Sequence, residues 1–321
     1  MGKPVFTLVA TAKNEGPYLL EWVAYHKMIG FDHILIFQND SDDGTHEILS
    51  ELKELGEVEY RYNRAERGRH QVTAYQRAAR TATYQASDYI LALDIDEFLH
   101  IKCGDGTVQD LHSALPDTDR TFLNWKCFGA SGHTAMPNAP VTKAFQSCET
   151  SKTIKTRVKP FKTLFKRSSF ARPGVHKPNA FQGDGDPTSA NGSGISSQDL
   201  DMRHFQCNDP EDRSLAQINH YMVKDPASFV LKSAKGSAHQ ADRPIDAAYW
   251  TARNQNKETD SSLAERAPQL TDAISRLKDR SKGKLAEHTQ KSHVLHALRA
   301  RQLIMQPAFR DLYDHCLRTN A

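Results

Sequence analysis

The sequence predicts an α/β fold with a mostly parallel central sheet, helices on both of its faces and a helical C-terminal extension. Two observations predict it. Over the first hundred residues, short runs rich in β-forming residues alternate with segments whose apolar residues recur at helical spacing. After about residue 240 only the helical spacing remains, with charged residues on the other faces of the helices. Repeated strand–helix–strand units of the first kind form parallel sheets with right-handed crossovers.

The elements of the first half follow from local signals. A strand is expected over 5–11, followed by a helix that begins near Pro17 and ends near Gly30, because proline suits a first helical turn and glycine follows many helix ends. The next expected elements are a strand at 33–39, a helix at 45–55 closed by Gly56, a strand at 58–62, a helix at 71–86 and a strand at 89–94.

The chain is expected to divide into two parts. Residues 1–240 would form the sheet domain and residues 241–321 the helical extension, whose helices pack against the sheet domain. Within the first part, residues 179–201 are rich in Gly, Ser, Asp and Asn and almost free of apolar residues, which predicts a flexible loop rather than a core element. The last helical segment combines apolar residues with Arg and His, so contact with a membrane surface or another chain is an alternative to core packing.

Composition excludes several classes. With 42 basic and 39 acidic residues the net charge is only +3, too weak for the basic field of a nucleic-acid-binding protein. The five cysteines are odd in number and lack CxxC spacing, so they indicate neither a disulfide framework nor a zinc site, and a cytoplasmic location is expected. The sequence has no run of about 18 or more apolar residues, so no transmembrane helix is expected. Peripheral contact at the inner face of a membrane stays open.

Each of the four expected strands ends in a polar cluster. The clusters are "TAKNEG", "QNDSDDGT", "NRAERGRHQ" and "DIDEF". In parallel sheets ligands bind outside the carboxyl ends of the strands, so we expect these four loops to converge on one edge.

The fourth cluster predicts a cation site. Asp94 and Asp96 are two residues apart, so in an extended segment both carboxylates point to the same side while Ile95 points away. Carboxylate oxygens suit Mg²⁺ or Mn²⁺, and Mg²⁺ is commonly held by one or two carboxylates, water and substrate phosphates. The alternative for so short a motif is a helix cap or a solvated turn.

The second cluster divides between two roles. Asp43 is expected to cap the helix that begins near Thr45. Asp40 is then the better candidate to accept hydrogen bonds from a nucleobase or ribose.

Taken in order, "ATAKNEGPYLLEWVAYHKMIGFDHILIFQNDSDDGT", "HQVTAYQRAAR" and "YILALDIDEFLH" resemble the family 2-like glycosyltransferases, close to the branch that carries KNE, NDSxDGT and DxDEF. The resemblance continues with "GVHKP" and "INHYMVKDPASFVLKSAKG" and covers about residues 4–240. It implies the A-type nucleotide-diphospho-sugar transferase fold. The second loop lacks the first acidic residue of the DDGSTDGT pattern of many members, so the base stays open, with a UDP-sugar as the first expectation.

The resemblance also implies roles for individual residues. Lys13, Asn14 and Glu15 would lie beside the nucleotide, and Asp40 would contact its base or ribose. Asp94 and Asp96 would bracket the metal ion and the diphosphate.

In the second half, the segments that resemble the family's carry further candidates. One of His176 and His220 is expected to complete the metal shell, although a hydrogen-bonded core histidine is the alternative for each. Lys232 and Lys235 are expected to contact the diphosphate. Trp125 is a candidate for stacking on a sugar, against the more common role of core packing. Most lysines and arginines of "KTRVKPFKTLFKRSSFARPGVHKP" are interpreted as a solvated face.

These observations predict a metal-dependent glycosyltransferase that moves a sugar from a nucleotide-diphospho-sugar to a hydroxyl of a carbohydrate or glycolipid acceptor. The resemblance implies inversion at the anomeric carbon, which calls for a carboxylate base. Glu149 is the first candidate for this base, followed by Glu97 and Asp201.

Two other functions remain as alternatives. One is a phosphoryl-transfer enzyme of the haloacid-dehalogenase type, which places its DxD after the first strand rather than the fourth. The other is a non-catalytic protein that binds a nucleotide-sugar or a glycan.

Overall fold

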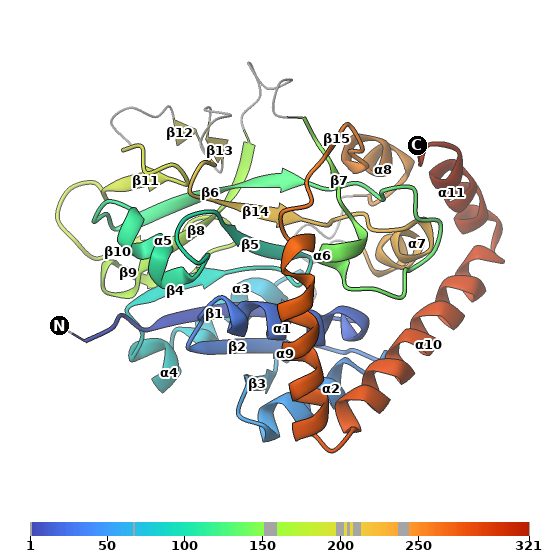
Figure 1. Cartoon of the computed structure of the whole chain (residues 1–321), viewed down its shortest axis with the longest axis horizontal. Helices are drawn as coiled ribbons and strands as arrows, with labels where there is room; N and C mark the ends of the chain where they lie inside the picture. The colour runs from blue at the N-terminus through green and yellow to red at the C-terminus, as the bar shows by residue number, and fades with distance from the viewer. Residues whose placement is uncertain are drawn as a thin grey trace.

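The computed structural model describes residues 2–66, 68–150, 159–196, 202–203, 206–207, 213–236 and 244–320. Most of its strands belong to one large sheet whose main path runs in the order β3-β2-β1-β4-β8-β6-β14-β5 (Figure 1). The strands on this path are β1 (Phe6–Ala12), β2 (His33–Gln38), β3 (Glu59–Tyr62), β4 (Tyr89–Ala92), β5 (Glu97–Ile101), β6 (Arg120–Cys127), β8 (Lys159–Lys166) and β14 (Ala216–His220).

The remaining described strands extend this sheet or form small pairs. β11 (Ser189–Asn191) joins β6, and β13 (Gln206–Cys207) joins β8 and pairs with β12 (Met202–Arg203). Two short pairs stand apart: β9 (Phe170–Arg172) with β10 (Asn179–Phe181), and β7 (Ser147–Cys148) with β15 (Glu258–Thr259).

Eleven α-helices lie in the described residues. They are α1 (Gly16–Met28), α2 (Thr45–Glu54), α3 (His70–Ala78), α4 (Ala82–Gln85), α5 (Val108–Ala114), α6 (Val141–Ala144), α7 (Pro226–Lys235), α8 (Ala247–Arg253), α9 (Ala267–Arg280), α10 (Lys284–Ile304) and α11 (Pro307–Arg318).

The predicted fold class is confirmed by the strand pairing. β1 pairs in parallel with β2 and β4, and β2 with β3, so the first four strands form the expected parallel half. β6 and β14 are also parallel, whereas β8 returns antiparallel between β4 and β6. β5 follows β4 directly in the chain, yet in the sheet order three strands separate them.

Helices cover both faces of the parallel half because its strands alternate between two cores. On β1, Leu8 and Ala10 join the core formed with α1 and α2, whereas Val9 joins the core formed with α3 and α4. This period of two is what a strand buried on both faces requires.

The expected helix over 71–86 is two helices, α3 and α4. Thr81 interrupts it with an extended backbone (ψ 149°), and its hydroxyl accepts a 3.2 Å hydrogen bond from the Tyr84 N–H. A threonine N-cap therefore starts a second helix where the apolar spacing predicted a continuous one.

The expected loop over 179–201 is wrong for part of its length. Ser189–Asn191 form β11, which pairs in parallel with β6, and all three residues are buried. Polar composition misled the prediction because small polar side chains can be buried when the backbone joins a sheet edge. Residues 197–201 lie outside the described residues.

The helical C-terminal extension is confirmed. α9 and α10 pack on α1, α10 also contacts α2 and α7, and α11 contacts α7 and α8 (Figure 1). None of the described helices is both long and apolar enough to cross a membrane. The proposed boundary between residues 240 and 241 falls outside the described residues and stays a prediction.

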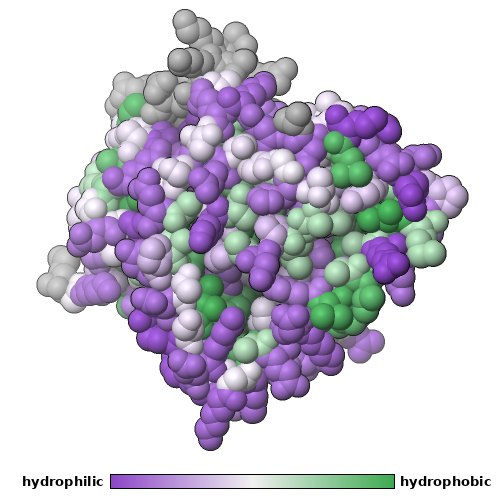
Figure 2. Space-filling view, turned by 45° about the vertical axis from the view of Figure 1, so that its right-hand side comes forward, coloured by the Kyte–Doolittle hydropathy of each residue, from purple (hydrophilic) through white to green (hydrophobic). Residues whose placement is uncertain are grey.

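α10 is amphipathic in its packing. Leu285, His296 and Ala300 are buried, while Val294 and Leu298 are about half exposed. Figure 2, which brings the right-hand side of Figure 1 forward, shows several hydrophobic areas separated by hydrophilic side chains rather than one continuous surface. Core packing therefore accounts for the buried face of this helix.

Candidate functional site

The loops after β1 and β2 are joined by hydrogen bonds, as the predicted convergence of strand ends requires. The Asn14 N–H donates to Ser41 Oγ (3.0 Å), and the Asp42 N–H donates to Asn14 Oδ1 (2.9 Å). Asn14 and Asp40 both adopt left-handed backbone conformations, with φ of 53° and 46°. Asn and Asp tolerate this region better than most residues, which allows both loops to turn sharply at the sheet edge.

Asp43 anchors the same junction. Its Oδ2 accepts from the Gly16 N–H (2.9 Å) and its Oδ1 from the Thr45 N–H (3.0 Å), so one carboxylate serves the first turns of two helices. The N-cap position of α2 is Gly44, one residue later than predicted. The division of roles within this loop is nevertheless the expected one, since Asp43 is buried and Asp40 is exposed.

Asp40 lies beside an aromatic ring that sequence analysis did not select. The Tyr62 hydroxyl, at the end of β3, donates to Asp40 Oδ1 over 2.5 Å, and Tyr62 is 56% exposed. An exposed ring next to an acidic acceptor offers both a stacking surface and a hydrogen-bond acceptor for a base or ribose.

Asp94 is held by two different elements. Its Oδ1 accepts from Gln71 Nε2 of α3 and its Oδ2 from Lys162 Nζ of β8, each over 2.9 Å. Lys162 also lies 3.2 Å from Glu97 Oε2 and is almost fully buried. Burial by itself would lower the pKa of Lys162, but the carboxylates of Asp94 and Glu97 raise it well above its usual value, so the ammonium stays charged.

Asp96 is paired with α7. Its Oδ2 accepts from Lys232 Nζ (2.9 Å), and its Oδ1 lies 3.4 Å from His220 Nε2. Burial alone would raise the pKa of the Asp96 carboxyl, but Lys232 and His220 hold it well below its usual range. We call Asp94, Asp96, Glu97, Lys162, His220 and Lys232 the strand-end site.

Glu97 forms the floor of the strand-end site. It is fully buried, its Oε2 accepts from the Asp94 N–H (2.9 Å), and burial raises its pKa well above the usual value. His220 Nδ1 lies 3.7 Å from Glu97 Oε1, and neither atom has a hydrogen-bond partner in the described part of the chain. Burial lowers the pKa of His220, so its imidazole is neutral near pH 7.

α7 also contributes lysines to the first loop. Lys235 Nζ donates to Glu15 Oε1 (2.6 Å) and to the Lys13 carbonyl (2.9 Å). Lys224, which precedes α7, is buried with its ammonium 4.3 Å from the centre of the Tyr18 ring, and burial lowers its pKa. The structure therefore brings Lys13, Glu15, Lys232 and Lys235 to one edge with the two aspartates.

The other predicted residues lie differently. His176 Nδ1 is 2.9 Å from the Phe161 carbonyl, and its ring packs against Trp125. Trp125 in turn packs edge-on against His220, with ring centres 4.2 Å apart. Glu149 Oε1 accepts from Arg213 (3.1 Å), which also donates to the Trp125 carbonyl. Asp201 lies outside the described residues.

The metal prediction fits only in part. Among the described residues, no group of three or more His, Cys, Asp or Glu side chains is arranged to hold a metal ion, so the expected shell of two carboxylates and a histidine is not assembled there. Asp94 and Asp96 alone supply the hard oxygen donors that Mg²⁺ or Mn²⁺ prefers, and Asp94 keeps 35% of its side chain exposed. The expected extended segment is wrong here, because residues 95–96 form a turn in which the Glu97 N–H donates to the Asp94 carbonyl. The carboxylates of Asp94 and Asp96 are held by Lys162 and Lys232, and cation binding by this pair stays a prediction.

Sequence analysis missed Lys162 by treating its basic segment as solvated. A signal existed in "KPFKTLFK": Lys162 and the buried Leu164 are two residues apart, so in a strand their side chains point to the same face. Gln71 lies in the third strand-end cluster and Lys224 just before α7, but neither was selected from the sequence.

Comparison with known proteins shows the family to which the chain belongs. The sequence profile of glycosyltransferase family 92 matches residues 11–280. A glycosyltransferase family 92 protein of Oryza sativa subsp. japonica is 31% identical over 140 residues, which are 41% of this chain and 23% of the rice protein. One from Arabidopsis thaliana is 25% identical over 144 residues, 41% of this chain and 24% of that protein. The matches thus span about a quarter of these relatives.

A solved structure of S. aureus TarS 1-349 in complex with UDP-GlcNAc is also similar, with a TM-score of 0.34 and 13% identity over 93% of this chain and 92% of that one. The resemblance seen in the sequence is confirmed at the level of a glycosyltransferase family, while the family 2-like branch is not. The chain belongs to glycosyltransferase family 92.

Proposed function

We propose that the protein transfers a sugar from a nucleotide-diphospho-sugar, with a UDP-sugar as the first candidate, to a hydroxyl of a carbohydrate or glycolipid acceptor. The observation that carries the proposal is the strand-end site, where two aspartates lie among lysines of β8 and α7. Membership of glycosyltransferase family 92 supports it.

The donor would lie along the edge formed by the first, second and fourth loops. Asp40 and Tyr62 suit the base or ribose, since both are exposed and joined by a hydrogen bond. Lys232 and Lys235 suit the diphosphate, because their ammonium groups are held at the edge by Asp96 and Glu15. Positive charge held in place at the leaving group stabilises the charge that develops there during transfer.

Asp94 and Asp96 would hold Mn²⁺ or Mg²⁺, which supplies further positive charge to the departing diphosphate. Lys162 donates to Asp94 and Lys232 donates to Asp96, so each carboxylate is oriented by its own lysine. The chain's own residues thus pre-position the acidic pair.

The transfer step is a displacement with inversion. The acceptor oxygen forms a bond to the anomeric carbon while the bond from that carbon to the diphosphate oxygen breaks, and a carboxylate takes the hydroxyl proton. Of the three candidates for this base, Glu97 is fully buried and contacts Lys162, and Asp201 lies outside the described residues. We propose Glu149, the first candidate from the sequence, as the base; its carboxylate accepts from Arg213, which also donates to the Trp125 carbonyl.

The direct test incubates the purified protein with a panel of nucleotide sugars, with and without Mn²⁺, and measures release of the nucleoside diphosphate. Release from one donor, stimulated by an acceptor glycan, supports the proposal. Phosphate esters in parallel reactions test the phosphoryl-transfer alternative. Donor binding without release, in the presence of any acceptor tested, would indicate the non-catalytic alternative.

Glu149→Gln tests the base. It should lower acceptor-dependent transfer while donor binding is kept, because the amide cannot take a proton. Unchanged transfer in this variant would remove Glu149 from the reaction.

Acceptors attached to lipids would bring the protein to a membrane surface. The exposed side chains of Val294 and Leu298 on α10 and of Met305 directly after it, with Arg301 nearby, form the surface that we propose for such contact. Flotation with anionic lipid vesicles tests it, and a Leu298→Glu variant should bind them less.

A further inference from the structure

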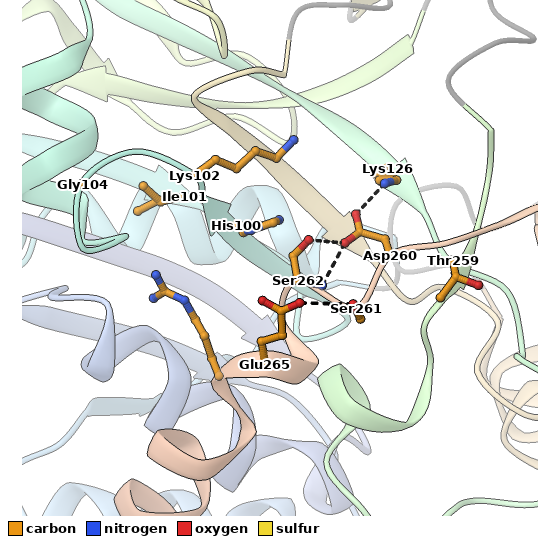
Figure 3. Close-up of a pocket in the computed structure, with 11 residues that line it drawn as sticks. His100, Ile101, Lys102, Gly104, Lys126, Thr259, Asp260, Ser261, Ser262 and Glu265 are labelled. Atoms are coloured by element: carbon orange, nitrogen blue, oxygen red, sulfur yellow. Dashed lines mark hydrogen bonds and ion pairs between the residues drawn. The ribbon is translucent and has the colours of Figure 1, made fainter.

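A polar cavity lies outside the strand-end site, with none of the residues of that site in its lining. It has a volume of about 660 Å³ and lies between the β5 and β6 strands and the segment that leads into α9 (Figure 3). Figure 3 shows His100, Lys102 and Lys126 on its strand side, and Asp260, Ser262 and Glu265 on the other. We call this cavity the polar pocket.

The polar pocket and Glu97 face opposite sides of the sheet. In the pairing of β5 with β14, Glu97 lies opposite His220 and His100 lies opposite Gln217. Because side chains alternate along a strand, His100 points away from the face that carries Glu97. Lys126 is in register with Asn219, one residue from His220, and so belongs to the same face as His100.

The cations of the polar pocket exceed its anions. Asp260 is paired with Lys126 at 2.5 Å and also accepts from Ser262. Lys102 and Arg266, in contrast, form no ion pair with a carboxylate of the described residues. Lys102 Nζ donates to the Arg213 carbonyl and the Arg266 guanidinium donates to the carbonyls of Asp105 and Gly106. In the described residues these two side chains thus donate to backbone carbonyls and not to carboxylates, which leaves both able to pair with an anionic ligand.

His100 provides an independent sign of a missing partner. Its side chain is 94% buried in the pocket wall, and within the described residues its Nδ1 has no hydrogen-bond partner. Buried polar atoms are normally satisfied, and one that is not points to a water or ligand that completes it.

We infer that the polar pocket is a binding site for an anionic sugar, that is, a sugar bearing a phosphate or a carboxylate. Its anionic group would contact Lys102 and Arg266, and its hydroxyls would contact His100, Ser262 and the neighbouring hydroxyl side chains. The volume is that of a small-molecule site. Ile101 is the one apolar side chain among the lining residues, so the pocket suits a hydroxyl-rich ligand better than an apolar one.

The protonation of the pocket agrees with this assignment. Burial, together with Arg213 and Lys126, lowers the pKa of Lys102 to about 8, and the Asp260 carboxylate opposes this shift only in part. Burial lowers the pKa of His100 to about 4, so its neutral imidazole offers one donor and one acceptor to a sugar.

The test measures calorimetric binding of glucose 6-phosphate, glucuronate and glucose to the full chain with UDP present at saturation, so that anion binding at the strand-end site is suppressed. We expect one or both anionic sugars to bind and glucose to bind far more weakly. If only one of the two anionic sugars binds, it identifies the anionic group that the pocket prefers. Equal binding of glucose, or no binding of either anionic sugar, would overturn the inference.

Lys102→Gln should weaken binding of the anionic sugar by roughly tenfold or more, the usual worth of a charge-assisted hydrogen bond. Lys291→Gln, which removes the same charge from the exposed surface of α10, should leave it unchanged. If both variants bind like the parent protein, the sugar binds elsewhere and the inference fails. The Lys102 comparison does not depend on UDP binding, so failure of the proposed transferase function would leave it interpretable.

Discussion

The strand-end site and the polar pocket both contain a lysine–aspartate pair that joins distant parts of the chain, yet they compensate charge differently. Lys232–Asp96 links α7 to the β4–β5 turn, and Lys126–Asp260 links β6 to the segment before α9. At the strand-end site a second lysine, Lys162, serves the remaining carboxylates Asp94 and Glu97. In the polar pocket the second cation, Lys102, has no described carboxylate.

This difference separates two uses of a buried charge. At the strand-end site each charged side chain is paired with one of opposite charge. Removal of one leaves its partner buried without a compensating charge, which is costly. In the polar pocket the excess charge is available to a ligand. Substitutions in the two regions can test this contrast.

Lys162→Met should destabilise the protein by about 3–5 kcal/mol, because it leaves Asp94 and Glu97 beside each other without their buried cation. Urea unfolding measures this change. Lys126→Met is the matched variant in the other region and should cost less, since Lys126 is 16% exposed and Lys162 only 1%. Equal costs would mean that the two regions are compensated alike.

Asp96→Asn should lower sugar transfer roughly 100-fold or more while the protein still folds. At constant side-chain size it removes the negative carboxylate that orients Lys232 towards the diphosphate and that would hold the cation. Asp94→Asn should act similarly. Asp272→Asn, on the exposed surface of α9, is the control and should keep full activity. Full activity of both site variants would exclude the acidic pair from the reaction.

His100 should make the polar pocket sensitive to acid. Its folded pKa of about 4 lies below the unfolded value near 6.5, so the unfolded state binds a proton that the folded state does not. Stability contributed by this histidine is complete above pH 6.5 and is lost by about 1.4 kcal/mol per pH unit as the pH falls towards 4. His26 and His296, with pKa values lowered by burial to about 3 and 4, act in the same direction.

Urea unfolding of the parent protein and of His100→Gln between pH 7 and 4 isolates this contribution. The variant should lose less stability than the parent protein over that range. Parallel pH profiles would show that His100 is already satisfied by a partner.

Asp40→Ala should weaken donor binding roughly tenfold, the effect of losing one or two hydrogen bonds to a base or ribose, with little change in the rate of transfer at saturating donor. Calorimetry with UDP measures the affinity. Asp272→Ala controls for the loss of a surface charge. An unchanged Kd would place the nucleotide elsewhere on the edge.

The smallest effect concerns the two histidines. If His220 contributes to cation binding through its contact with Asp96, His220→Ala should raise the Mn²⁺ concentration needed for half-maximal activity several-fold. His176→Ala should act mainly on thermal stability, because its Nδ1 contacts the Phe161 carbonyl. The same Mn²⁺ requirement in both variants would leave neither histidine a role in cation binding.

The sequence predicted the parallel half of the fold well because its signals are local. Pro17, Gly30 and Gly56 mark helix boundaries that the structure confirms, with positive φ at both glycines. β8 and β11 were not predicted, since their pairing joins residues far apart in the chain and their composition is basic or polar.

In the candidate site, too, the residues that the sequence predicted were those with a local signal. Asp94, Asp96 and Asp40 were recognisable because each lies at the end of a predicted strand or within two residues after it. Lys162 and Tyr62 were not, because their relation to the aspartates depends on which strands become neighbours in the sheet. The charge excess of the polar pocket could not be predicted at all, since Lys102 and Arg266 are 164 residues apart in sequence.

The direct passage from β4 to β5 has a geometric consequence. Only residues 93–96 connect Ala92 to Glu97, and five extended residue steps reach at most about 18 Å. In a flat sheet the four strand intervals between β4 and β5 would span about 19 Å, and the Glu97 N–H donating to the Asp94 carbonyl shortens the connection further. The sheet must therefore curl until its far edge approaches β4. The connecting residues 93–96 include both Asp94 and Asp96, so the curvature of the sheet and the spacing of the acidic pair depend on the same four residues.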